Sequence, residues 1–279
     1  MKQRPSFPAR LDTTLAKNRP NAHGAVVPGA PAAQPPATAN APASKNTKLA
    51  PAQAASQGHG MESSAVRARM VQKLAGQGIS DPHVLAAMGT IERHRFVDSA
   101  LINQAYEDTS LPIGLGQTIS KPGVVSRMLE LLCNGQSAKL GRVLEIGTGC
   151  GYQAAVLSLL AREVYSIERL RGLHDRAREN LRHMRLANLH LLFGDGMQGY
   201  PKGAPYAAII AAAGGEAVPQ AWVDQLAVGG RLVAPVVTTG APGSAGATQA
   251  LLVLDKTAQG VRQTILEAVH FVPLKSGVA

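Results

Sequence analysis

Glycines and acids recur along this chain in a spacing that suits a nucleotide-like ligand. An apolar run ends in Glu145, and glycines then occupy every second position, at Gly147, Gly149 and Gly151, before a helical stretch begins. Glycine lets the backbone turn sharply and approach a ligand closely. A second apolar run ends in Glu168, whose carboxylate can accept hydrogen bonds from both hydroxyls of a ribose. This arrangement predicts a site for an adenosine-containing ligand.

The kind of ligand follows from the acid beside the glycines. A negative charge there would repel a pyrophosphate but would attract a cationic methionine group. The pattern acid-x-G-x-G-x-G also resembles the first motif of class I methyltransferases. A third apolar run ends in Gly194-Asp195, placed to contact an adenine. We therefore expect S-adenosyl-L-methionine as cofactor, bound by Glu145, Gly147, Thr148, Gly149, Gly151, Glu168, Asp195 and Gly196. The alternative is a glycine turn that serves only packing.

A second motif, LPIGLGQTISKP at residues 111–122, points to the substrate. Together with Tyr106 and Asp108 it resembles the aromatic-x-Asp-x-x-LPIG-x-GQTIS-x-P loop of the protein-L-isoaspartate O-methyltransferases, and the resemblance extends over about residues 61–275. It implies an enzyme that transfers a methyl group from S-adenosylmethionine to the α-carboxylate of L-isoaspartyl residues in damaged proteins, and so initiates their repair. It also implies that Ser120, with Thr118 beside it, lies against the substrate as a candidate catalytic residue.

Ser120 has a competing structural interpretation. It stands just before a helical run with Pro122 in its first turn, where serine is a favoured N-cap. A substrate carboxylate is already ionised at neutral pH and needs no base. A hydroxyl would therefore contribute by orienting that carboxylate rather than by acting as a covalent nucleophile. Both roles for Ser120 remain open at this point.

The elements that would position these residues alternate along the chain. Apolar runs predict strands at residues 142–146, 163–167, 189–193, 206–211 and 231–237, with helices at 124–132, 152–160, 171–184 and 219–226. Two last strands, 250–254 and 261–272, lack a helix between them. This order predicts an α/β, Rossmann-like class I methyltransferase fold, with a doubly wound, mostly parallel sheet and an antiparallel C-terminal edge. Residues 111–122, with two glycines and two prolines, are expected to form a loop.

The first sixty residues differ from the rest in composition. They contain nine of the eighteen prolines, and seven Lys or Arg against one acid, Asp12, so they contribute +6 of the formal net charge of +10. Such a segment cannot bury enough apolar surface to fold. We expect a disordered basic tail over residues 1–60 and a methyltransferase domain over residues 61–279. The two cysteines, Cys133 and Cys150, form no metal-binding pattern, and we expect no metal.

Two rival functions remain. The first is a class I methyltransferase that acts on RNA or a small molecule. The second is a non-catalytic protein that binds S-adenosylmethionine as a sensor. The chain shows neither base-stacking aromatics interleaved with cations nor an NPPY-like amine-methylating motif. We expect isoaspartyl proteins and peptides as partners, no stable nucleic-acid partner and no membrane association. We expect a cytoplasmic location, because neither a secretory signal nor a membrane span is evident. We also expect a monomer.

Overall fold

The N-terminal part of the fold is helical. The computed structural model describes residues 58–238 and 248–279. Helix α1 (Gly58–Gly76) is followed by α2 (Pro82–Thr90) and by two 3-10 helices, η1 (Arg93–Phe96) and η2 (Ser99–Gln104). The Asp81 side chain caps α2, as expected from Asp followed by Pro, by accepting hydrogen bonds from the N–H groups of His83 and Val84. The predicted tail falls almost wholly outside the described residues.

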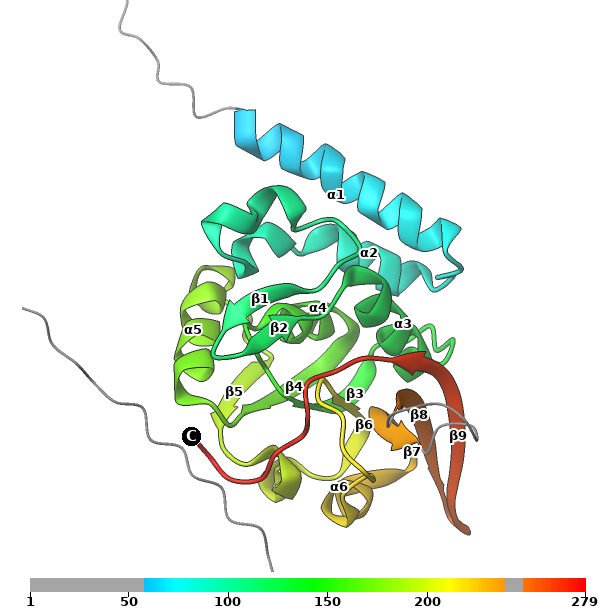
Figure 1. Cartoon of the computed structure of the whole chain (residues 1–279). Coiled ribbons are helices and arrows are strands. Elements are labelled where there is room, and N and C mark those ends of the chain that lie inside the picture. The colour runs from blue at the N-terminus through cyan, green and yellow to red at the C-terminus, as the bar shows by residue number, and fades with distance from the viewer. Residues whose placement is uncertain (1–57, 239–247) are drawn as a thin grey trace, which may run out of the picture. The chain divides into compact units, whose positions relative to one another are not determined.

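A seven-stranded sheet forms the centre of the molecule (Figure 1). Its strands are β3 (Leu140–Ile146), β4 (Ala161–Glu168), β5 (Leu189–Phe193), β6 (Tyr206–Ala211), β7 (Leu226–Thr238), β8 (Thr248–Thr257) and β9 (Gly260–Val269). Their spatial order is β5-β4-β3-β6-β7-β8-β9, parallel from β5 to β7 and antiparallel at β8 and β9. The order reverses beside β3, which is where ligands bind in such folds. The predicted fold class is confirmed.

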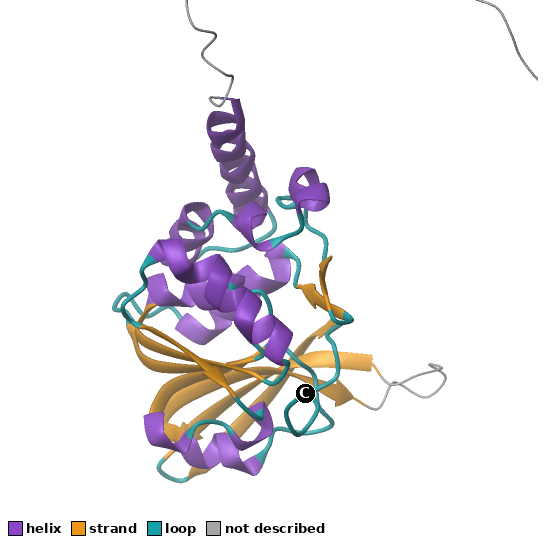
Figure 2. Cartoon of the chain, turned by 90° about the vertical axis from the view of Figure 1, so that its left-hand side faces the viewer, coloured by secondary structure: helices purple, strands orange, loops and turns teal. Residues whose placement is uncertain are grey.

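Helices cover the two faces of the sheet unequally (Figure 2). Helices α3 (Pro122–Cys133), α4 (Tyr152–Leu160) and α5 (Arg171–Leu181) join the N-terminal helices in the larger hydrophobic core. The smaller core surrounds Trp222 of α6 (Gln220–Gln225), which is 1% exposed. The Trp222 indole Nε1–H donates to the carbonyl of Gly196 at 2.8 Å, so α6 also holds the turn that follows β5. The polar end of a buried tryptophan is thereby satisfied.

The prediction of a loop over residues 111–122 is wrong. Strands β1 (Leu111–Gly114) and β2 (Gln117–Ile119) pair antiparallel in a separate two-stranded hairpin. Leu111, Ile113 and Ile119 are buried while their neighbours in the strands are not, and this alternation anchors one face of the hairpin. Its tip holds Leu115 at φ 51°, in the left-handed region, and 62% exposed. Within the described parts of the chain, no helix is long and apolar enough to cross a membrane.

Candidate active site

A cavity of about 450 Å³ lies where β3 and β4 end, within the size range of small-molecule sites. Four segments line it: the hairpin at residues 113–120, the glycine turn at 146–153, the end of β4 at 167–173, and residues 272–275. Val125, Gly196, Ala212 and Ala213 complete the lining. The two motifs singled out in the sequence, more than twenty residues apart, therefore border one cavity.

The glycine turn has the backbone geometry expected of it. Gly147, Gly149 and Gly151 have φ angles of 91°, 57° and 92°, a region that other residues rarely adopt. Gly147 and Gly149 line the cavity, as does Thr148 between them. Gly151 does not. It lies so close to α5 that an added Cβ would stand 2.8 Å from Leu181 Cδ1. Gly151 therefore allows close packing of the turn rather than contact with a ligand.

Glu145 supports the glycine turn from the interior of the protein and does not line the cavity. Its side chain is fully buried, and its Oε2 accepts a hydrogen bond from the Ser166 hydroxyl, which is in turn bonded to Thr148 Oγ1 at 2.6 Å. Burial raises the pKa of Glu145 to about 8, although the hydrogen bond from Ser166 opposes the rise. A largely protonated acid at neutral pH would not attract a cation by charge. Direct contact of Glu145 with the cofactor remains a prediction.

Glu168 lies in the cavity wall with its carboxylate fixed in orientation. Its Oε2 accepts the Gly149 N–H at 2.9 Å, and its Oε1 accepts the Leu170 N–H at 2.9 Å. Each oxygen of a carboxylate can accept a further hydrogen bond. Glu168 therefore ties the glycine turn to the end of β4 and still has capacity for the two hydroxyls of a ribose.

Asp195 and Gly196 differ in their relation to the cavity. Gly196 lines it, packed so closely that a Cβ would stand 2.6 Å from Ile146 Cγ2. Asp195 lies behind it, and its two oxygens accept the N–H groups of Met197 at 2.8 Å and Gly277 at 2.7 Å. The predicted contact of Asp195 with adenine stays a prediction, since the aspartate does not line the cavity.

Ser120 and Thr118 both line the cavity, opposite the glycine turn. The interpretation of Ser120 as a helix cap is wrong, because Lys121 is the N-cap residue of α3. The acceptor for the first turn of that helix is instead Asp108, whose Oδ1 lies 2.7 Å from the Gly123 nitrogen. The Ser120 hydroxyl has no hydrogen-bond partner among the described residues, so it is available to a ligand.

Residues 270–279, called here the C-terminal strap, form a wall that sequence reasoning missed. The strap leaves β9, crosses the carboxyl ends of the strands and runs toward α5 (red in Figure 1). Backbone hydrogen bonds hold it, from Gly214 to Val272, from Leu274 to Gly214, and between Ala279 and the backbones of Arg169 and Arg171. The predicted last strand ends earlier, at Val269, because the strap begins there. Only the extent of the resemblance noted above, to about residue 275, pointed to this region.

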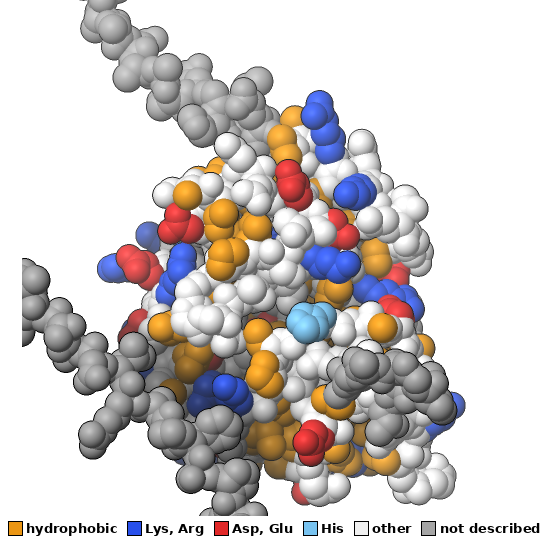
Figure 3. Space-filling view, viewed as in Figure 1, with side chains coloured by type: hydrophobic (Ala, Val, Ile, Leu, Met, Phe, Trp, Pro, Cys, Tyr) orange, Lys and Arg blue, Asp and Glu red, His pale blue; other side chains and the backbone are white. Residues whose placement is uncertain are grey.

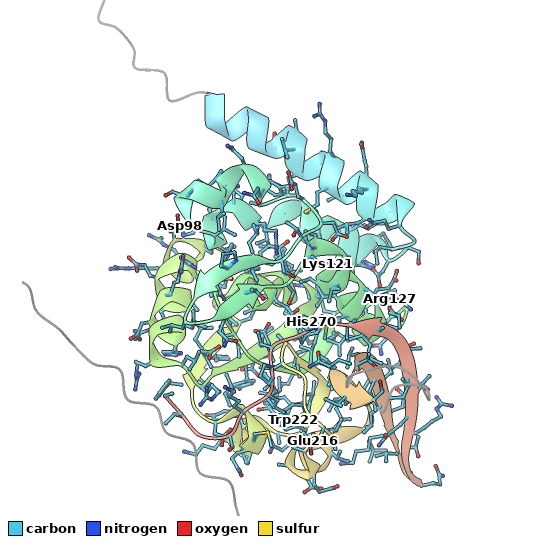
Figure 4. The ribbon with its side chains drawn as sticks, in the orientation of Figure 1. Asp98, Lys121, Arg127, Glu216, Trp222 and His270 are labelled. Atoms are coloured by element: carbon cyan, nitrogen blue, oxygen red, sulfur yellow. The ribbon has the colours of Figure 1, made fainter. Side chains whose placement is uncertain are left out.

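The polar surroundings of the cavity contain few charges. Lys275 of the strap is exposed at its border, and Lys121 and His270 lie near each other on the same face (Figures 3 and 4). Cys150 also lines the cavity, but burial raises the pKa of its thiol, which keeps it protonated and weakly nucleophilic. The site therefore offers hydroxyls and backbone groups for orientation, with no activated nucleophile of its own.

Comparison with known proteins agrees with this arrangement. A family model described as protein-L-isoaspartate(D-aspartate) O-methyltransferase matches residues 65–279. A protein-L-isoaspartate O-methyltransferase of Leptothrix cholodnii is 58% identical over 240 residues, which cover 85% of this chain and 83% of that protein. One of Methylibium petroleiphilum is 52% identical over 275 residues, 98% of this chain and 96% of that protein. A solved structure of a protein-L-isoaspartate O-methyltransferase aligns with a TM-score of 0.66 and 28% identity, covering 76% of this chain and 67% of that one.

Proposed function

The chain belongs to the protein-L-isoaspartate(D-aspartate) O-methyltransferase family, and from this premise we propose that it methylates the α-carboxylate of L-isoaspartyl residues in damaged proteins. One observation carries the proposal. The glycine turn with Glu168 and the hairpin with Thr118 and Ser120 border the same cavity. A cofactor bound by the first and a peptide bound by the second would meet there.

The residues of the cavity fit S-adenosylmethionine. The glycines of the turn leave space that side chains would fill, since a Cβ on Gly149 would stand 3.2 Å from Ile113 Cδ1 on the opposite wall. Glu168 offers a carboxylate in a fixed orientation for the ribose hydroxyls, and Gly196, Ile146 and Ile167 form a part of the wall that suits a flat apolar ring. When bound, S-adenosylmethionine supplies an electrophilic methyl group on a sulfonium.

The chemistry asks the protein for alignment rather than for acid or base. The carboxylate of an isoaspartyl residue is ionised at neutral pH and is itself the nucleophile. What accelerates such a transfer is orientation of the reacting groups and removal of water from around the carboxylate. The hairpin and the strap line the cavity, and in this proposal they serve both tasks by holding the peptide against the cofactor.

Ser120 and Thr118 have the role of donors in this scheme. A hydroxyl can donate one hydrogen bond to a carboxylate oxygen, and such a charge-assisted bond is stronger than one between neutral groups. Held by one oxygen, the carboxylate would present the other to the methyl group. The free hydroxyl of Ser120 supports this assignment, because no described residue competes for it.

The rival substrates receive less support. On the face shown in Figure 3, Lys and Arg side chains are dispersed among hydrophobic and uncharged ones, which does not favour a nucleic-acid groove. The expectations of a cytoplasmic location, a monomer and no stable nucleic-acid partner stay predictions. Size-exclusion chromatography coupled to light scattering of the full chain would test the monomer.

The deciding experiment follows labelled methyl from S-adenosylmethionine to two synthetic peptides that differ only in isoaspartate or aspartate. We expect base-labile label on the isoaspartyl peptide alone. We expect Ser120→Ala to lower kcat by about 10- to 100-fold, because loss of a charge-assisted hydrogen bond costs about 1.5–3 kcal/mol. Binding of S-adenosylhomocysteine should be unchanged in this variant. Binding of S-adenosylhomocysteine without label on either peptide would contradict the proposal.

A further inference from the structure

A carboxylate outside the cavity holds the turn that carries Ser120. Asp108 Oδ1 accepts a hydrogen bond from the backbone N–H of Gly123 at 2.7 Å, in the first turn of α3. The N-cap residue itself, Lys121, makes no side-chain capping bond. Asp108, fifteen residues earlier, therefore supplies the acceptor that a local cap usually provides. Ser120 lies two residues before the helix that is fixed in this way.

A buried cation, Arg93, stacks on the opposite wall of the cavity and is influenced by the charge of Asp108. Arg93 is fully buried, its Nε donates to the Ala105 carbonyl at 2.7 Å, and its guanidinium carbon lies 5.0 Å from the centre of the Tyr152 ring. Burial lowers the pKa of Arg93, and the charge of Asp108 is among those that oppose the change. Tyr152 begins α4 directly after the glycine turn and lines the cavity. The charge of Asp108 thus acts on a buried cation that stacks on Tyr152, while its hydrogen bond holds the first turn of the helix that follows Ser120.

We propose that Asp108 is a positioning residue for methyl transfer, which holds Thr118 and Ser120 in register with the glycine turn through its hydrogen bond to the Gly123 N–H. The inference rests on the proposed function, because it concerns the same site. Asp108 does not line the cavity and so does not touch the substrate. Its effect is on geometry, and a displacement of about 1 Å at a reacting group can lower a rate on the order of 100-fold.

Three variants separate this role from a general effect on folding. Asp108→Ala removes the acceptor, whereas Asp108→Asn keeps an oxygen that can accept the same N–H while it removes the charge. Asp98→Ala is the matched control, because Asp98 caps the short helix η2 by accepting the Ala100 N–H at 3.0 Å. Figure 4 places Asp98 at the margin of the molecule, away from Lys121 at the start of α3.

The measurements are kcat and KM with the isoaspartyl peptide, the Kd for S-adenosylhomocysteine, and hydrogen exchange of the Gly123 amide. For Asp108→Ala we expect kcat to fall at least tenfold, the Kd to stay within twofold, and the Gly123 amide to exchange faster. Asp108→Asn should keep kcat within about threefold of wild type, since a neutral acceptor weakens but retains the bond. Asp98→Ala should match wild type in all three measurements.

Several results would overturn the inference. Unchanged kcat in Asp108→Ala would do so, as would equal loss in Asp108→Ala and Asp108→Asn, which would assign the effect to charge. An equal loss of S-adenosylhomocysteine affinity would indicate collapse of the whole site. If Asp108→Ala does not fold, a folded but inactive Asp108→Asn overturns the hydrogen-bond mechanism. If wild type methylates neither peptide, the proposed function fails, and exchange of the Gly123 amide alone decides whether Asp108 holds this turn.

Discussion

The cavity has a floor and a roof that are built in different ways. The floor consists of the glycine turn and Glu168, at the ends of β3 and β4, and rests on residues such as Ile146 and Ile167, which are 2% and 4% exposed. The roof consists of the β1–β2 hairpin and the C-terminal strap, which include exposed residues and attach through a limited set of hydrogen bonds. A change in the floor therefore disturbs the core, whereas a change at an exposed residue of the roof alters the site and leaves the buried anchors Leu111, Ile113 and Ile119 in place.

The largest effect is expected from a substitution in the floor, at Glu168. Glu168→Ala removes the acceptor for the N–H groups of Gly149 and Leu170 and the partner proposed for the ribose. We expect the Kd for S-adenosylhomocysteine to rise about 100-fold, equivalent to about 2.7 kcal/mol, as measured by isothermal titration calorimetry. Glu179→Ala, at an exposed position on α5, is the control. An affinity within threefold of wild type would show that the floor does not depend on this carboxylate.

The buried carboxyl of Glu145, beneath the glycine turn, should make the stability of the protein depend on pH. The pKa of Glu145 rises from 4.5 to about 8 on folding, chiefly through burial. Between these values the unfolded chain releases a proton that the folded chain keeps, so the free energy of unfolding falls as pH rises. We expect wild type to lose roughly 3 kcal/mol of stability relative to Glu145→Gln between pH 5 and pH 8, measured by urea unfolding without cofactor.

Glu130 provides the contrast for that experiment. Burial acts to raise the pKa of Glu130, but hydrogen bonds from the N–H groups of Ser80 and Asp81 outweigh it and hold the pKa below its usual value. Its stabilising contribution is lost only as pH falls below the range tested. The stability of wild type relative to Glu130→Gln should therefore stay constant from pH 5 to pH 8, because both proteins keep Glu145. Parallel slopes for wild type and Glu145→Gln would mean that Glu145 ionises normally.

The smallest expected effect concerns the attachment of the roof. Arg176 Nη1 of α5 donates to the Ile113 carbonyl of β1 at 2.7 Å. Arg176→Met keeps the apolar stem and removes this bond, and we expect the KM for the isoaspartyl peptide to rise about fivefold, equivalent to about 1 kcal/mol. Arg178→Met, exposed on the same helix, is the control. Should cofactor affinity fall as far as in Glu168→Ala, the distinction between floor and roof would not hold.

The sequence predicted the floor well because local patterns encode it. The strand at residues 206–211 and the helix at residues 152–160 have the bounds expected, and the acid of β4 lies in the cavity wall. Glu145 shows where such a pattern stops being informative. Its place at the end of an apolar run does not reveal on which side of the turn its carboxyl lies, and the pairing of β3 with β4 sets it beside Ser166.

The roof was harder to predict, because it depends on contacts between residues that are separated in the sequence. Asp108 caps a helix through an amide fifteen residues later in the sequence. The rule that favours a serine next to the helix therefore assigned the cap to the wrong residue. The strap is held by backbone hydrogen bonds, which are independent of side-chain type, and by distant side chains such as Asp195, whose pairing with Gly277 no local pattern shows. The motif over residues 111–122 identified the substrate side of the site by resemblance but not its hairpin form.

Leu115 at the tip of the hairpin bears on how this enzyme could diversify. Its side chain is largely exposed, its backbone is held at a positive φ between two glycines, and it borders the cavity. Residues such as Asn or Gly adopt that conformation with less strain, so replacing Leu115 need not weaken the fold. Selection for new peptide contexts can therefore explore this position freely, and a library randomised at Leu115 is a direct route to variants with altered substrate range.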